Sequence, residues 1–232
     1  MRRCIATILL SLVAATASAT SLPSEVRLGV VDALAPRLSA GFGKAASADR
    51  APTIRDEWQL GAVAREQTLA RLNAQGYRAQ AVRLPAALEQ AVRSGGALET
   101  HGSSVQLTTK FGRDLDRWLR AQQLDGVVVL RSLARPLEAG APAQSGYGIA
   151  RRGQTPVAYA NLMPLLIHGS PPMIAGAPQC LVSVPVDSAL IATPKTLGEL
   201  AALRPALEDA LRRSIDGALI RAGVGSGEAA CE

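Results

Sequence analysis

Three side-chain types that nucleophilic enzymes use lie within one stretch, "IHGSPPMIAGAPQCLV" at 167–182, as His168, Ser170 and Cys180. A serine nucleophile needs its hydroxyl on a sharp turn beside a base, commonly within a G-x-S-x-G frame. Two prolines follow Ser170, and the stretch lacks that frame. The pattern therefore favours a hairpin end shaped by Gly169 and the prolines over a catalytic serine.

The chain has two histidines, His101 and His168, and neither an H-x-x-x-H nor a C-x-x-C pattern. A zinc site needs convergent His, Cys or carboxylate ligands, so the sequence predicts no metal site. It also predicts no cofactor, because "GFGKAAS" at 41–47 lacks the leading glycine and the final hydroxyl of a phosphate loop. One catalytic alternative stays open, a hydrolase site in which His101 or His168 meets a carboxylate within about 3.2 Å in a concave pocket.

The cysteines are Cys4, Cys180 and Cys231. Cys4 lies in the first segment, which is expected to be removed, so the mature chain keeps two. In an oxidising compartment an isolated pair favours a disulfide between Cys180 and Cys231. It would close a loop of about 50 residues and stabilise the fold by about 4 kcal/mol in the chain-entropy model. Two free or intermolecular thiols and a catalytic thiol at Cys180 are the alternatives.

Residues 1–19 have the pattern of a secretory signal peptide: two arginines, an apolar run, and small residues at Ala17 and Ala19. The apolar run is shorter than the roughly 20 residues that cross a bilayer, and no later run is longer. The sequence therefore predicts a periplasmic or secreted protein, cut after Ala19, with no integral membrane segment after the signal is removed.

Charge and aromatic content exclude some partners. Lys and Arg total 25 against 19 Asp and Glu, a net charge of +6. The basic residues are spread along the chain without interleaved aromatic residues, so nucleic acid is not a predicted partner. Aromatic residues make up 3% of the chain, which also counts against a carbohydrate enzyme.

The first half alternates strands and helices. We expect strands at 28–34, at 77–84 and around the run Val127–Leu130, whose lack of polar alternation is typical of a central strand buried on both faces. We expect a helix at 56–75, a shorter one from Pro85, and a third ending near Gln123. Phe111, Leu115, Trp118 and Leu119 form the buried stripe of that third helix.

The second half changes character. Three strands over 146–191 form a predicted antiparallel meander, and a long helix begins near Pro205. Two long loops are expected near 35–55 and 133–146, with a flexible tail at 223–232. The prediction is a mixed α/β fold, with one mixed sheet flanked by helices, in a single domain over 20–232.

The order of these pieces resembles that of small α/β bacterial envelope proteins. A signal, the strand "LGVVDAL", a long loop, the strand "LDGVVVLRS" after a helix, a "GYGI" strand, a meander and a terminal helix follow one another over residues 26–222. The resemblance is to penicillin-binding-protein activator lipoproteins and to the amino-terminal domain of the Tol-system β-propeller protein, at the level of element order. It implies a non-catalytic envelope protein that binds a protein partner, and we expect the loops at 35–55 and 133–146 to form its recognition surface.

Overall fold

The structure is a computed structural model that describes residues 26–41, 53–101, 104–141, 143–187 and 196–232. The predicted signal peptide at 1–19 lies outside these residues. The helices are α1 (Leu60–Ala74), α2 (Ala86–Ser94), α3 (Thr109–Ala121), the 3-10 helix η2 (Gly198–Leu203) and α4 (Arg204–Arg221). The strands are β1 (Arg27–Asp32), β2 (Arg37–Gly41), β3 (Thr53–Arg55), β4 (Arg78–Ala81), β5 (Leu98–His101), β6 (Ser104–Leu107), β7 (Gly126–Ser132), β8 (Arg135–Pro136), β9 (Ala143–Gln144), β10 (Gly146–Arg152), β11 (Thr155–His168), β12 (Met173–Gly176) and β13 (Cys180–Pro185).

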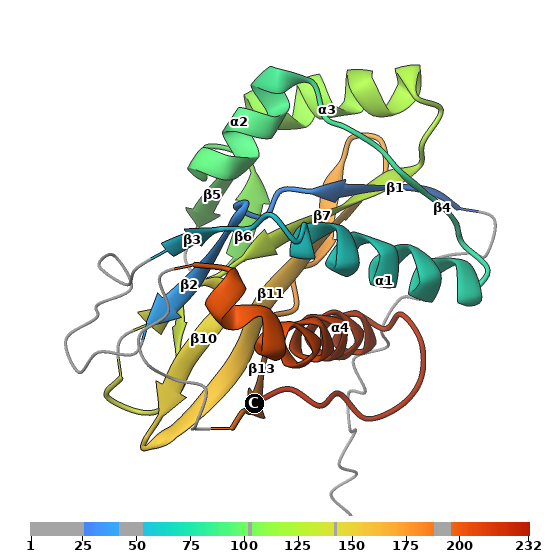
Figure 1. Cartoon of the computed structure of the whole chain (residues 1–232). Coiled ribbons are helices and arrows are strands. Elements are labelled where there is room, and N and C mark those ends of the chain that lie inside the picture. The colour runs from blue at the N-terminus through green and yellow to red at the C-terminus, as the bar shows by residue number, and fades with distance from the viewer. Residues whose placement is uncertain (1–25, 42–52, 102–103, 142, 188–195) are drawn as a thin grey trace, which may run out of the picture.

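One nine-stranded mixed sheet forms the centre of the fold (Figure 1). Its path is β3-β2-β10-β11-β7-β1-β4, and β12 and β13 also pair with β11. β1 runs parallel to β4 and β7, whereas β11 is antiparallel to β7, β10, β12 and β13. The predicted mixed α/β class is confirmed. None of the described helices is both long enough and apolar enough to span a bilayer.

Helices cover both faces of the sheet. α1 and α4 pack against one face, and α2 and α3 lie over the other (Figure 1). Successive side chains of β7 point to opposite faces of the sheet, so this strand contributes to both cores. Val128 and Leu130 belong to the core under α1 and α4, and Val127 and Val129 belong to the core under α2 and α3. All four side chains are fully buried, so the predicted double burial of this strand is confirmed.

β11 joins the two halves of the sheet. Its first half pairs with β10 and β13, and its second half pairs with β7 and β12. Leu162 pairs both with Ser132 of β7 and with Cys180 of β13, so these two strands lie on opposite sides of β11 there.

The third strand of the predicted meander is two strands. β12 and β13 pair with different parts of β11, and Pro178 lies in the break between them. Between the pairs Leu162–Cys180 and Leu166–Gly176, one side of β11 pairs with no described strand. Pro164 falls in this gap, where a residue without an N–H is tolerated.

The prediction of two long loops is wrong for the described parts of both segments. β2 and β3 occupy the described ends of 35–55, and β8 and β9 form a two-stranded ladder within 133–146. β2 adds in parallel to β10, where Gly148 permits close contact. A Cβ on Gly148 would lie 2.1 Å from the carbonyl oxygen of Ser39. The pairing of β2 therefore depends on Gly148, about 110 positions away along the chain, so the residues of β2 alone do not predict this strand.

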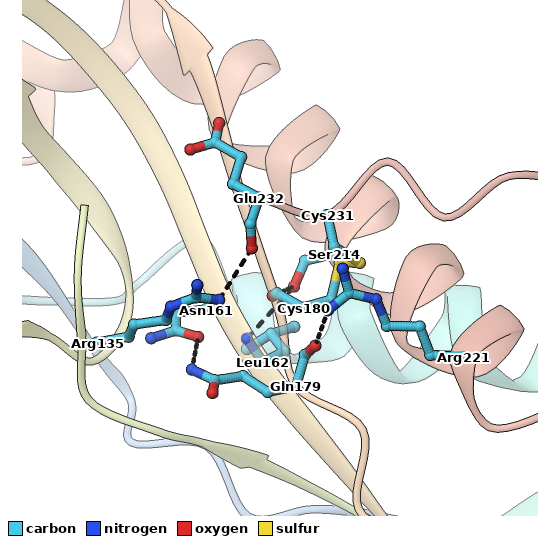
Figure 2. Close-up of a disulfide and its surroundings, with 9 residues drawn as sticks. All are labelled: Arg135, Asn161, Leu162, Gln179, Cys180, Ser214, Arg221, Cys231 and Glu232. Atoms are coloured by element: carbon cyan, nitrogen blue, oxygen red, sulfur yellow. Dashed lines mark hydrogen bonds between the residues drawn. A yellow bond between two sulfur atoms is a disulfide. The ribbon is translucent and has the colours of Figure 1, made fainter. Parts of the chain in front are cut away.

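The carboxyl-terminal tail is fixed at its end rather than flexible. Cys231 forms the predicted disulfide with Cys180, across a Cα–Cα distance of 5.0 Å (Figure 2). The Glu232 N–H donates to the Leu181 carbonyl at 2.9 Å, and the Glu232 carboxylate pairs with Arg152 at 2.8 Å. The tail therefore covers β13, which would otherwise present an edge of the sheet.

Ser214 of α4 satisfies the backbone where β13 begins. Its Oγ donates to the Cys180 carbonyl at 2.7 Å and accepts from the Leu162 N–H at 3.3 Å (Figure 2). Ser214 is fully buried, so these bonds replace the water that the backbone groups lose on folding. Helix α4 is in this way tied to both β11 and β13.

Gly217 of α4 leaves the space that the disulfide occupies. A Cβ there would lie 2.6 Å from Cys231 Sγ and 2.7 Å from Cys180 Sγ. We expect Gly217→Ala to lower the free energy of unfolding by about 1–2 kcal/mol, because overpacking costs more than the roughly 1 kcal/mol gained in helix propensity. Urea unfolding measures the change.

Gly112 of α3 is the matched control. A Cβ there meets nothing nearer than Leu107 Cβ at 4.0 Å, so Gly112→Ala should raise the free energy of unfolding by about 0.5–1 kcal/mol. The Gly217→Ala penalty should shrink in a Cys180→Ala/Cys231→Ala background. A penalty of the same size in that background would show that the disulfide is not its cause.

Candidate functional site

His168 and Ser170 lie at the turn that leads from β11 to β12, as the sequence predicted. Gly169 has a φ of 94°, and the Ser170–Pro171 peptide bond is cis. The Ser170 hydroxyl donates to Asp116 Oδ1 at 3.0 Å and accepts from Arg120 at 2.8 Å. Arg120 also pairs with Asp116 at 2.7 Å, so the turn is fastened to α3 by a closed polar set.

A hollow of about 500 Å³ beside this turn brings His168 and Ser170 together with Asp116 and Asp125. Within the described residues, His168 makes no hydrogen bond with a carboxylate, and Asp125 instead accepts from the Arg27 N–H at 2.8 Å. The Ser170 hydroxyl donates to the Asp116 carboxylate, which also pairs with Arg120, and not to an imidazole. The hollow therefore gathers the residue types of a hydrolase without the serine–imidazole contact that such a site needs. The side chain of His101, the other candidate base, lies outside the described residues.

Two carboxylates lie at the amino end of α1, and the sequence analysis did not single them out. Asp32 ends β1, and its Oδ1 accepts from the Leu34 N–H at 2.9 Å. Asp56 precedes α1, and its Oδ2 accepts from the Leu60 N–H at 2.8 Å and from the Tyr147 hydroxyl at 2.7 Å. Asp56 is only 8% exposed, and its Oδ1 has no hydrogen-bond partner among the residues that the structure describes.

The carboxylates of Asp32 and Asp56 both lie against the first turn of α1. α1 begins at Leu60 and not at the predicted residue 56, and Gln59 before it has a left-handed backbone with φ of 55°. The Asp56 carboxylate accepts from the Leu60 N–H, one of the N–H groups that the first turn leaves without a partner within the helix. A Cβ on Gly61 would lie 2.5 Å from Asp32 Oδ2, so this glycine lets the Asp32 carboxylate approach the first turn of α1. Burial raises the pKa of Asp32, and burial together with Asp56 raises the pKa of Tyr147. Across the described residues, no group of three or more His, Cys, Asp or Glu side chains is arranged to hold a metal ion.

A groove of about 700 Å³ lies between α2 and α3. Its floor contains Leu88 and Phe111, which are 5% and 4% exposed. Trp118, predicted to be part of a buried stripe, is only partly buried and lines the groove. The stripe prediction holds for Phe111, Leu115 and Leu119, which face the α2–α3 core.

The β5–β6 hairpin sets the spacing of the two helices. The Ala97 N–H donates to the Ala91 carbonyl of α2, and the Thr108 N–H donates to the Ala97 carbonyl, both at 3.0 Å. The Thr108 hydroxyl also donates to the Gly96 carbonyl at 3.3 Å. The groove is therefore bounded by a fixed backbone arrangement, and Gly96 and Thr108 both line it.

Charged side chains form the rim of the groove on the α3 side. Asp114 pairs with Lys110 at 2.8 Å and with Arg117 at 3.7 Å. The hydrogen bond from Lys110 lowers the pKa of Asp114, and Arg117 and Arg113 add to this effect. The arrangement combines an apolar floor with a rim that carries two cations and one anion.

No described residue of either predicted recognition loop lines this groove or the hollow at Ser170. One feature of the sequence could have indicated the groove. Trp118 follows Arg117 directly and is two residues before Arg120, on a helix with a narrow apolar stripe, so its ring is near the polar edge of that stripe. The separation of α2 from α3 has no local signal.

Asp32 gives a testable pH dependence. Because its pKa is raised in the folded state, the native protein binds this proton more tightly than the unfolded chain. The contribution of Asp32 to stability is therefore present below the unfolded pKa and is lost as the pH rises through the folded pKa. We expect Asp32→Asn to unfold at higher urea than the wild type at pH 7, and the gap to close below about pH 3.9, where the carboxyl is protonated in both states.

Asp209→Asn is the control, because Asp209 is exposed on α4 and pairs with Arg213 at 3.6 Å. It should give no comparable gain at pH 7. If Asp32→Asn instead destabilised the protein, and did so more at pH 7 than at pH 3.5, the charge of Asp32 would be stabilising through Arg65 and Arg93.

Comparison of the chain with protein-family models, with curated proteins and with solved structures finds no match, so the site is interpreted from its own geometry.

Proposed function

We propose that this chain is an exported, non-catalytic binding protein of the bacterial envelope, and that it binds an apolar ligand or partner group in the groove between α2 and α3. The observation that carries the proposal is the groove itself, with a volume of about 700 Å³ and an apolar floor beneath a charged rim. Ligand sites commonly have about 300–1,000 Å³, apolar linings and a few placed polar groups.

The lining of the groove supports this use. Three alanines, Ala87, Ala91 and Ala121, line it where larger side chains would fill it. Trp118 and Phe111 supply aromatic surface, which contributes strongly to binding because of its large area and few rotatable bonds. The hollow near Ser170 supports catalysis less well, since His168 has no carboxylate partner among the described residues.

Export is supported by two independent features. Residues 1–19 have the pattern of a signal peptide, and the Cys180–Cys231 disulfide suits an oxidising compartment. The element order shared with small envelope proteins points to the same location.

The export part predicts a processed and oxidised chain. Protein recovered from the periplasm or medium of an expressing bacterium should begin at Thr20 and show no reactive thiol before reduction. Cys180→Ala/Cys231→Ala should lower the free energy of unfolding by up to about 4 kcal/mol, because the disulfide closes a loop across a separation of 51 residues. Intact mass and a thiol titration measure the first two outcomes. A retained segment 1–19 or two reactive thiols per chain would contradict the proposal.

The binding part predicts a single saturable site for N-phenyl-1-naphthylamine, a neutral apolar fluorophore. The chain has two tryptophans, so Trp58→Phe leaves Trp118 as the sole donor for energy transfer to the probe. Ala87→Gln should weaken binding by about tenfold or more, because its side chain enters the groove.

Ala86→Gln is the matched control, since Ala86 is the exposed neighbour on α2 and does not line the groove. Its affinity should stay within about twofold of the parent. Thermal unfolding checks that all variants are folded. The absence of saturable binding, or equal losses in Ala87→Gln and Ala86→Gln, would overturn the groove as the site.

A further inference from the structure

We infer that the ligand of the α2–α3 groove is an anionic amphiphile, with its acyl or alkyl chain between the helices and its carboxylate or phosphate headgroup at Lys110 and Arg117. The inference rests on the proposed function and names the chemistry of its ligand. It is carried by the position of the charges relative to the apolar surface.

The groove is polar on one side only. The side chains that α2 contributes are Ala87, Leu88 and Ala91, all apolar. All the charged side chains of the lining belong to α3: Lys110, Asp114 and Arg117. A ligand that fits must therefore have an apolar body and a charged group at one edge, which is the definition of an amphiphile.

The sign of the rim is positive. Lys110 and Arg117 are 83% and 82% exposed, and both pair with the same carboxylate, that of Asp114. One negative charge thus faces two positive ones, and neither cation has its charge fully balanced. Both long side chains extend into solvent beside the groove, where they can turn toward an anionic headgroup.

The direction of α3 adds to this preference. Lys110 and Thr108 lie at its amino end, where the helix dipole is positive. Trp118 lies eight residues beyond Lys110 on α3, about 12 Å, and lines the same groove, so a chain whose headgroup lies at the α3 rim can reach both Phe111 and the indole. The two cations follow the α3 edge, with Lys110 near its amino end and Arg117 next to Trp118.

The size of the groove favours a small amphiphile over a protein segment. A volume of about 700 Å³ falls in the range of small-molecule sites. An acidic amphipathic peptide is therefore the competing outcome of the test.

The experiment is displacement of N-phenyl-1-naphthylamine from the full mature chain by lysolipids below their micelle concentration. Myristoyl lysophosphatidylglycerol is anionic, and myristoyl lysophosphatidylcholine has the same chain and no net charge. We expect the anionic lipid to bind about fivefold more tightly in 20 mM salt, and the preference to vanish near 0.5 M salt, where exposed charges are screened. Sodium myristate should behave like the anionic lipid, and inorganic phosphate alone should not displace the probe.

Charge variants assign the preference to residues. Lys110→Gln/Arg117→Gln should remove the preference for the anionic lipid, measured as the ratio of the two lysolipid affinities within the same variant. Asp114→Asn should increase the preference, because it removes the opposing charge. Arg213→Gln on α4 removes one exposed cation away from the groove and should leave the preference as it is.

The outcomes separate this inference from the proposed function. Probe binding that Ala87→Gln weakens, with equal affinity for both lysolipids, would keep the groove as a binding site and overturn the anionic ligand. Displacement by an acidic amphipathic peptide and by neither lipid would also overturn it. Failure of the probe and of both lipids to bind would overturn the two together.

Discussion

The fold depends on β11, a strand of 14 residues that four other strands share. At Leu162 it pairs with β7 on one side and with β13 on the other. The parallel half of the protein, built on β1, β4 and β7, is therefore connected to the antiparallel half through one strand. Any change that shifts the register of β11 moves both halves, because each residue pair on either side is set by the same backbone.

Buried polar groups fix this register. Asn161, fully buried, donates to the Leu133 carbonyl and to the Gln144 carbonyl, and its Oδ1 accepts from Gln179 at 2.8 Å (Figure 2). The next residue, Leu162, donates to Ser214 of α4. A slip of one residue would place an apolar side chain among these backbone groups and leave them unsatisfied, at a cost of about 1–3 kcal/mol for each. The disulfide adds to the same point, since Cys180 is the β13 partner of Leu162.

The sequence predicts the parts of this fold that are encoded locally. The run Val127–Leu130, the amphipathic face of α3 and the hairpin end at Gly169 are each specified by the residues within the element. β2 and the division between β12 and β13 are not, because the first needs Gly148 of β10 and the second needs two separate regions of β11. The disulfide was predictable because only Cys180 and Cys231 lie outside the segment 1–19 that has the pattern of a signal peptide. The sequence predicts that Ser170 lies in a turn, but it does not predict the hydrogen bonds of its side chain, since the partners Asp116 and Arg120 come from a helix about 50 positions earlier.

The position of the groove depends on the contacts that fix α3 on the sheet. Phe111, Leu115 and Leu119 fix one face of α3 on the sheet, and Ser170 is joined to Asp116 and Arg120 on a second side. Next to the β5–β6 hairpin, backbone hydrogen bonds join Ala97 to Ala91 of α2 and Thr108, which precedes α3, to Ala97, so they fix where the two helices meet the hairpin. A groove that is bounded by backbone hydrogen bonds in the absence of a ligand needs little rearrangement to bind one. Little of the binding free energy is then spent on ordering the site. The same hydrogen bonds place the Lys110 end of α3 next to the hairpin. The charged side chain of Lys110 and the apolar side chain of Phe111 therefore both line this end of the groove.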